Sequence, residues 1–294
     1  MSNKKKGNSS FWISTIIAFL LSVFLTLASY LGGIYFGLFN NNLILDALNS
    51  TNYYNAILDN TSEKAAALAI PMGLPADIFN NVFTLDSTYS DGRAIMQNAF
   101  KGESYTLDTS DIENRITSNI NIYLTSKNLT ATPEQQNNIN EFAQTVAGEY
   151  VKNISIPYIN YYVQLRSMFS NVVMIGLPVL LLLSAAAVFL LIRLHRWLHR
   201  SLRYITYGTL AAAIMTGTIP LYALISGSYR HLNVSPEYFY NFLISYITQS
   251  IVTFLYISLL LFVISFALIT VIYFRRKELK KKSERVIHRS TSEA

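Results

Sequence analysis

Hydrophobic and polar positions are strongly segregated along this chain. Four long segments contain no Asp, Glu, Lys or Arg and are rich in Leu, Ile, Val and Phe, namely 7–45, 167–192, 204–229 and 238–274. A helix needs about 20 predominantly apolar residues to cross a hydrocarbon core roughly 30 Å thick. The pattern therefore predicts four transmembrane helices, at 11–38, 169–192, 204–226 and 244–274.

The segment 39–168, between the first two predicted spans, carries the signals of helices. Thr132-Pro133-Glu134-Gln135 and Ser110-Asp111-Ile112-Glu113 are helix starts, because a capping residue is followed three positions later by Gln or Glu. Apolar positions behind both starts repeat every three or four residues, and no segment alternates with period two for long enough to require a sheet. Pro157 should break the helix before the second span. Further helices are predicted at 43–69, 75–84 and 90–101, the last ended by Gly102.

These patterns predict an all-α polytopic membrane protein with four transmembrane helices and an all-α extracytoplasmic domain, 39–168, inserted between helices 1 and 2. Only 14% of the residues are charged and 51% are hydrophobic, which excludes an ordinary soluble domain. The first apolar segment is about twice as long as the apolar core of a secretory signal peptide, so it is predicted to remain as a span.

Positive charges gather in the segments that share one side of the membrane if the chain crosses four times. These segments are 1–10 with three lysines, the elbow 193–203 with four arginines, and the tail 275–294 with eight Lys and Arg residues. The positive-inside rule makes that side cytoplasmic, with both termini, and makes 39–168 and the loop 227–243 extracellular. The net charge of +6 then reflects topology, and no nucleic-acid partner is predicted.

The chain contains no cysteine, which excludes a disulfide, thiolate catalysis and a cysteine-ligated metal. Together with abundant Asn, Ile, Lys and Tyr, this composition is typical of a Gram-positive bacterium with an AT-rich genome, so a bacterial cell membrane is the expected location. The stretch "DSTYSDG" at 86–92 lacks the Gly and the Glu that a calcium loop needs at its sixth and twelfth positions. No cofactor or metal ion is expected.

The elbow "RLHRWLHRSLR" combines arginine, histidine and tryptophan. His195 and His199 have the spacing of a two-histidine metal site, but Arg196 stands where such a motif has Glu, and cations oppose metal binding. We predict instead a short helical turn at the headgroup layer. It would contact lipid or a partner protein through Arg193, Arg196, Trp197, Arg200 and Arg203.

Two groups of polar side chains lie in the predicted outer segments. Arg230, His231 and Glu237 form an outer-loop cluster able to hold an anion or a proton, although Glu237 also suits the first turn of the last helix. Asp108, Asp111 and Glu237 are the carboxylates available to an envelope enzyme. The outer domain itself contains no histidine for a Ser–His relay.

The predicted spans hold no ionisable residue at mid-depth, where pumps and ion-coupled carriers usually place one. Gln249 is predicted to be a buried amide that needs a hydrogen-bonding partner. Small residues at four-residue spacing predict close helix–helix contact along the third span, in the series Gly208, Ala212 and Thr216 and in the pair Ala213 and Gly217.

The layout, with the large outer loop first, resembles that of the tetraspan claudin-like proteins in topology alone, because the paired cysteines and the tryptophan motif of that family's first loop are absent. A large ordered domain without a catalytic constellation predicts a non-enzymatic envelope protein that senses or binds through that domain. Its expected partners are the lipid bilayer and a separate membrane or cytoplasmic protein, or further copies of itself. Two alternatives remain open: a transporter component or permeation subunit for lipid or small molecules, and an envelope enzyme that uses outer-face carboxylates.

Overall fold

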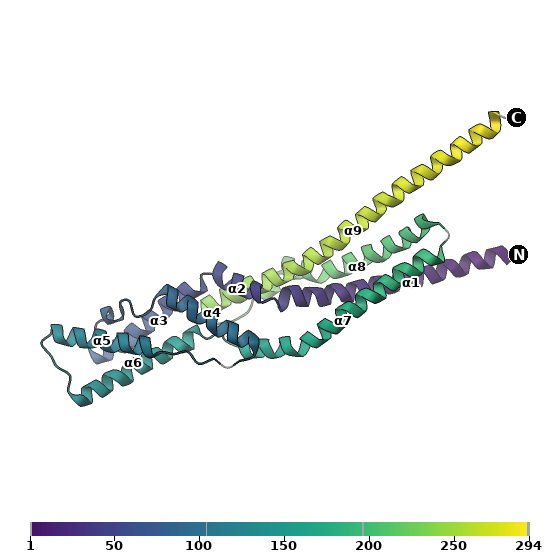
Figure 1. Cartoon of the computed structure of the whole chain (residues 1–294). Coiled ribbons are helices and arrows are strands. Elements are labelled where there is room, and N and C mark those ends of the chain that lie inside the picture. The colour runs from purple at the N-terminus through teal and green to yellow at the C-terminus, as the bar shows by residue number, and fades with distance from the viewer. Residues whose placement is uncertain (1, 104, 196, 293–294) are drawn as a thin grey trace. The chain divides into compact units, whose positions relative to one another are not determined.

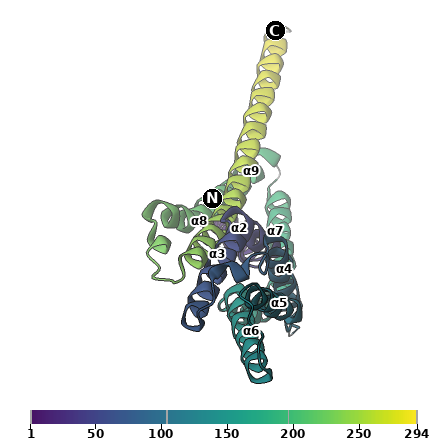
Figure 2. The same ribbon diagram turned by 90° about the vertical axis from the view of Figure 1, so that its left-hand side faces the viewer.

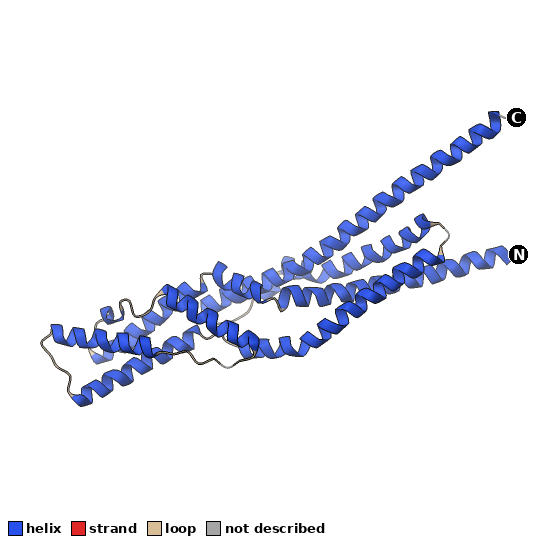
Figure 3. Ribbon diagram, viewed as in Figure 1, coloured by secondary structure: helices blue, strands red, loops and turns tan. Residues whose placement is uncertain are grey.

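The computed structural model describes residues 2–103, 105–195 and 197–292, with side chains for 10–103, 105–195 and 197–278. The chain is 86% helical, and the residues that are described form no strand (Figure 3). The prediction of an all-α protein is confirmed.

The chain divides into two compact units. The first, which we call the span unit, comprises Met1–Asn40, Met168–His231 and Ile247–Ala294. The second, the bundle unit, comprises Asn41–Ser167 and Leu232–Tyr246. The segment expected to fold as one inserted domain therefore shares its compact body with residues 232–246, which come from the loop before the fourth predicted span and from the first three positions of that span.

The span unit is built from long helices (Figure 1). Its elements are α1 (Ser2–Gly33), the π-helical turn η1 (Ile34–Leu38), most of α7 (Ile159–Leu194), α8 (Leu198–Ser226), the 3₁₀ turn η4 (Ser228–Arg230) and most of α9 (Glu237–Ser292). Four helical stretches are long and apolar enough to cross a membrane: Ser10–Leu38, Pro133–Leu194, Leu198–Ser226 and Glu237–Glu278. Four such stretches indicate a multi-pass membrane protein in a lipid bilayer.

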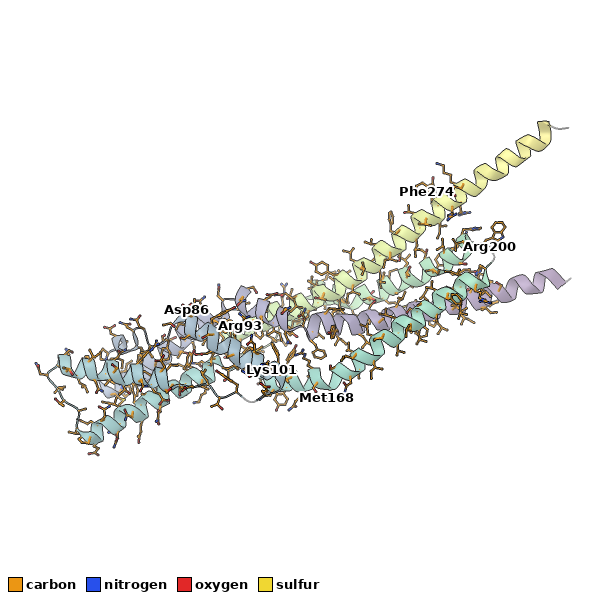
Figure 4. All side chains as sticks on the ribbon, viewed as in Figure 1. Asp86, Arg93, Lys101, Met168, Arg200 and Phe274 are labelled. Carbon is orange, nitrogen blue, oxygen red and sulfur yellow. The ribbon has the colours of Figure 1, made fainter. Side chains whose placement is uncertain are left out.

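The helices of the span unit extend beyond the predicted spans. Helix α9 begins seven residues before the predicted 244, and α8 begins at Leu198, so the elbow 193–203 is mostly helical. Met168, labelled in Figure 4, is the first α7 residue of the span unit, and Phe274 is the last α9 residue before the basic tail. Hydropathy sets the apolar length of a span, whereas backbone hydrogen bonding carries the helix on into polar sequence.

The bundle unit contains shorter helices (Figures 1 and 2). They are α2 (Asn41–Ser50), α3 (Tyr53–Ala69), the 3₁₀ turns η2 (Ile70–Met72) and η3 (Ala76–Phe79), α4 (Leu85–Lys101), α5 (Ser110–Ser126) and α6 (Pro133–Ile154), with the first turns of α7 and α9. Helices α5 and α6 lie side by side, and α3 packs against both α4 and α6. The largest fully buried side chains of the unit are Tyr53, Leu48, Ile57, Val82, Met96, Ile116, Ile120, Val146, Tyr150 and Ile154.

Several helix boundaries follow the predicted signals. The Thr132 hydroxyl accepts from the backbone N–H of Gln135, and the Gln135 side chain accepts from the N–H of Thr132, so the predicted start of α6 is confirmed. Gly102 ends α4 in the left-handed conformation, with φ +77°, which other residues adopt only with strain. The helix break expected at Pro157 lies between α6 and α7.

Other boundaries differ from the prediction. The expected helix 43–69 is two helices, because Asn52 takes a left-handed conformation between α2 and α3. The expected helix 75–84 is only the 3₁₀ turn η3, and α4 begins at Leu85 where Thr84 and Ser87 cap each other. The expected capping box of Ser110 with Glu113 is wrong: the residue before α5 is Thr109, whose hydroxyl donates to the Glu113 carboxylate at 2.6 Å.

Candidate functional site

An apolar cavity of about 210 Å³ lies within the bundle unit. Every lining residue is aliphatic, aromatic, proline or methionine, and the side-chain oxygens among them are all tyrosine hydroxyls. The lining residues are Ile44 of α2, Met96 of α4, Ile156, Pro157 and Tyr158 before α7, Ile159 and Tyr162 of α7, Val234, and Phe239, Phe242, Leu243 and Tyr246 of α9.

The local sequence explains how α7 and α9 bring their side chains to this cavity. Pro157 ends the helical run, and Tyr158 takes a positive φ of 62°, so the chain turns before α7 begins. Residues Ile156 to Ile159 therefore line the cavity as a bend. On α9, Phe239, Phe242 and Tyr246 repeat at spacings of three and four and place three rings on one face.

The aromatic rings around the cavity contact one another. Tyr162 of α7 packs edge-on against Tyr246 of α9 with ring centroids 6.4 Å apart, and Tyr246 stacks on Phe242 at 6.2 Å. Phe242 in turn lies 5.5 Å from Tyr53, which is fully buried in α3. These ring pairs stabilise the cavity wall, because stacked and edge-to-face rings contribute more free energy than the burial of their apolar area alone.

The size and lining of the cavity define what it can hold. An engineered apolar cavity of about 150 Å³ stays dry and binds benzene. A cavity of 210 Å³ with this lining suits several methylene groups or one ring, and it offers no group for proton transfer or metal ligation apart from weakly acidic phenols. The arrangement is that of a binding site for an apolar group.

A cation stands next to the cavity. The Phe100 ring at the end of α4 lies 6.3 Å from the Tyr162 ring, and the Arg166 guanidinium lies 5.8 Å from the centre of the Phe100 ring. Arg166 follows Tyr162 by one helical turn and is half-buried. Neither the Asp111–Arg115 nor the Glu149–Lys152 salt bridge involves Arg166.

A second hollow of about 310 Å³ in the bundle unit is lined partly by α5 and α6. Its lining mixes apolar side chains such as Leu124 with polar ones such as Gln135 and Asn138. Gln135 is already engaged in the helix cap described above. This hollow therefore lacks the uniform apolar character of the first cavity.

Several polar side chains of the bundle unit form hydrogen bonds between its helices. The Lys64 ammonium donates to the Asn153 side-chain oxygen at 2.9 Å, and the Asn153 amide donates to the Thr61 hydroxyl at 3.1 Å. The Tyr150 hydroxyl donates to the Asp91 carboxylate at 2.8 Å. These bonds tie α6 to α3 and α4, since a buried polar group without a partner is costly.

The carboxylates expected for an envelope enzyme also have structural partners. Asp108 accepts hydrogen bonds from the Ser110 hydroxyl at 2.6 Å and the Ser110 N–H at 3.0 Å, and both bonds hold the pKa of Asp108 below its ordinary value. Asp111 forms a salt bridge with Arg115 at 2.6 Å. Glu237 occupies the first turn of α9, where the helix dipole favours a carboxylate. Such contacts are typical of carboxylates at the first turn of a helix, where they stabilise the helix.

The elbow residues are divided between two helices. Arg193 lies in the last turn of α7, Trp197 precedes α8 and is exposed, and Arg200 and Arg203 lie in the first turns of α8 (Arg200 is labelled in Figure 4). Arg196 lies outside the described residues. The described residues of the elbow belong mostly to the end of α7 and the start of α8.

The two elbow histidines face different neighbours. The His195 ring lies 5.3 Å from the Tyr204 ring, and its Nε2 lies 3.4 Å from the Ser14 hydroxyl of α1. The His199 ring lies 6.2 Å from Trp197. Since the break between α7 and α8 separates the two histidines, they do not share the helical face that the motif spacing assumed.

The predicted outer-loop cluster falls in both units. Arg230 ends η4 in the span unit with its guanidinium 5.6 Å from the centre of the Tyr229 ring, and His231 follows it. Glu237 belongs to the bundle unit.

The predicted small residues of the third span lie at close contacts on two faces of α8. A Cβ on Gly208 would stand 3.0 Å from the backbone oxygen of Ala18 in α1, and a Cβ on Gly217 would stand 2.6 Å from the Ser258 hydroxyl of α9. Ala212 and Thr216 are fully buried. The Gln249 side chain is half-buried, whereas Ser250 beside it is buried, because packing turned that face of α9 inward.

The sequence interpretation missed the matching surface of α1. Its buried small residues Ser14, Ala18 and Ser22 follow one another at four-residue spacing, and Gly33 meets the Phe254 ring of α9. The sequence of α1 has the same four-residue spacing of small residues that predicted the contact surface of α8, and this spacing could have identified the surface of α1 as well. The cavity residues carried no comparable signal, because they come from four separate segments.

No group of three or more His, Asp or Glu side chains in the described part of the chain is arranged to hold a metal ion. A scan against protein-family models and searches of the curated proteins and of the solved structures found no match to this chain.

Proposed function

We propose that this chain is a multi-pass envelope protein whose bundle unit binds an apolar ligand outside the cytoplasm and signals to, or supports, a separate protein partner. The observation that carries the proposal is the cavity lined by Met96, Tyr162 and Tyr246. An apolar cavity of this kind can bind an apolar ligand, and its lining offers no group for catalysis.

The proposed orientation places the bundle unit outside and both termini inside. The positive-inside rule supports it, because four crossings would put the three basic segments 1–10, 193–203 and 275–294 on one side. The basic elbow and tail would then meet anionic lipid or a cytoplasmic partner. Crosslinking in native membranes should return a second protein, and Arg200→Gln should reduce its recovery without loss of insertion.

The ligand-binding proposal is tested with a photoactivatable alkyl probe added to membranes that contain the full chain. The expected product is labelled Met96, whose helix, α4, is not one of the candidate spans. Leu243→Trp fills the cavity and should reduce labelling of Met96 several-fold. Ile122→Trp, at an exposed position of α5, is the matched control and should leave labelling unchanged. Equal labelling in all three proteins would contradict the proposal.

A further inference from the structure

We propose that the apolar ligand is one acyl chain of an anionic membrane phospholipid, with the chain in the cavity and the phosphate at Arg166. This inference rests on the proposed function and names its ligand. It is carried by the uniformly apolar lining together with the cation beside it.

The lining selects a hydrocarbon chain. Aliphatic side chains such as Ile44, Ile156 and Leu243 face aromatic ones, and a flexible chain of methylene groups adapts to both. Helices α7 and α9 line the cavity with their first turns and continue as candidate spans. Lipid acyl chains are the most abundant apolar molecules around helices that cross a bilayer, which favours lipid over a soluble apolar ligand.

Arg166 selects the headgroup. Its guanidinium is held over the Phe100 ring, and Phe100 packs against Tyr162 of the cavity wall, so one continuous set of contacts joins the cation to the cavity. A planar guanidinium donates two parallel hydrogen bonds to a phosphate. The ring beneath it reduces its conformational freedom, so less entropy is lost when the phosphate binds. A net negative headgroup complements this charge.

The test uses photoactivatable-chain analogues of phosphatidylglycerol and phosphatidylcholine, in vesicles that contain the full chain. Labelled Met96 is the readout. Phosphatidylglycerol should label it several-fold more than phosphatidylcholine, and Arg166→Gln should reduce the phosphatidylglycerol labelling about fivefold. Lys127→Gln is the matched control, because Lys127 also lies over an aromatic ring of the bundle unit, Tyr123 at 5.7 Å, but α5, which carries that ring, supplies no residue to the cavity lining.

The outcomes separate the two proposals. Equal labelling by both lipids, or no effect of Arg166→Gln, would overturn the headgroup assignment while the cavity remains an apolar site. Labelling by the simple alkyl probe but by neither lipid would show an occupant other than lipid and overturn this inference alone. Absence of labelling by all probes would overturn the proposed function as well. Competition by inorganic phosphate would show that the headgroup contact is the phosphate.

Discussion

At the scale of single residues, two glycines of the bundle unit occupy opposite environments. Gly92 lies inside α4, where a Cβ would overlap the Tyr54 ring. Gly148 lies inside α6, where a Cβ would meet nothing within 4 Å. The same substitution should therefore change stability in opposite directions.

Gly92→Ala should destabilise the bundle unit by about 1–3 kcal/mol, because the buried Tyr54 ring cannot shift without disturbing its neighbours. Gly148→Ala should stabilise it by about 0.5–1 kcal/mol through helix propensity. Hydrogen exchange of the α4 and α6 amides in the full chain measures both. A destabilising Gly148→Ala, or a neutral Gly92→Ala, would show that these environments are assigned wrongly.

Tyr54 also makes stability depend on pH. Burial raises its pKa to about 12, the neighbouring Tyr89 adds to the rise and Arg93 opposes it. The unfolded chain deprotonates a tyrosine near pH 10, so the stabilising contribution is full below about pH 10 and is lost as pH rises towards 12. Alkaline unfolding followed by tyrosinate absorption should show this loss, and Tyr54→Phe should diminish it. An identical alkaline profile for Tyr54→Phe would contradict the assignment.

At the scale of elements, α8 and α9 are joined by a close contact between small residues. The Ser258 hydroxyl donates to the backbone oxygen of Ala213 at 2.8 Å, directly beside Gly217. The Ser265 hydroxyl donates to the Thr209 hydroxyl at 2.9 Å two turns further along. Helices in lipid associate through this kind of packing and hydrogen bonding, since lipid is as apolar as their side chains.

Gly217→Ala should destabilise the span unit by about 1–3 kcal/mol, because its Cβ meets the Ser258 hydroxyl at 2.6 Å. Ser258→Ala should cost about 0.6 kcal/mol for the lost interhelical bond. The double variant should cost less than the sum by about 1 kcal/mol, since removal of the hydroxyl relieves the overlap. Thermal unfolding of the original chain, both single variants and the double variant in detergent measures this double-mutant cycle. Gly217→Ala combined with Ser265→Ala is the control and should be additive.

The element scale also shows which sequence signals were sufficient. The cap at Thr132 and the glycine stop at Gly102 were read correctly, because each signal is completed by atoms within four residues. The division at Asn52 and the start of α4 at Leu85 were missed. The start of α4 was also marked locally, because Thr84 and Ser87 cap each other, whereas the left-handed turn at Asn52 makes no side-chain cap.

At the scale of the whole molecule, the absence of cysteine makes topology directly measurable. Single cysteines introduced at the exposed positions Ser110 and Arg200 report on the bundle unit and on the elbow. Ser110→Cys should react with an impermeant maleimide on intact cells, and Arg200→Cys should react only after permeabilisation. The unmodified chain is the unlabelled control. The reverse pattern would show that the proposed orientation is inverted.

The sequence by itself determined that the chain is all-helical and has four apolar stretches of spanning length, because hydropathy sums over neighbouring residues and the bilayer sets the required length. Only the tertiary structure decided that α9 begins inside the bundle unit, that Ser250 and not Gln249 is buried, and that a cavity lies against Tyr162. These features depend on which face of a helix meets a partner distant in sequence. Arg166 gains its proposed role for the same reason, since Phe100, which holds its guanidinium, comes from another helix.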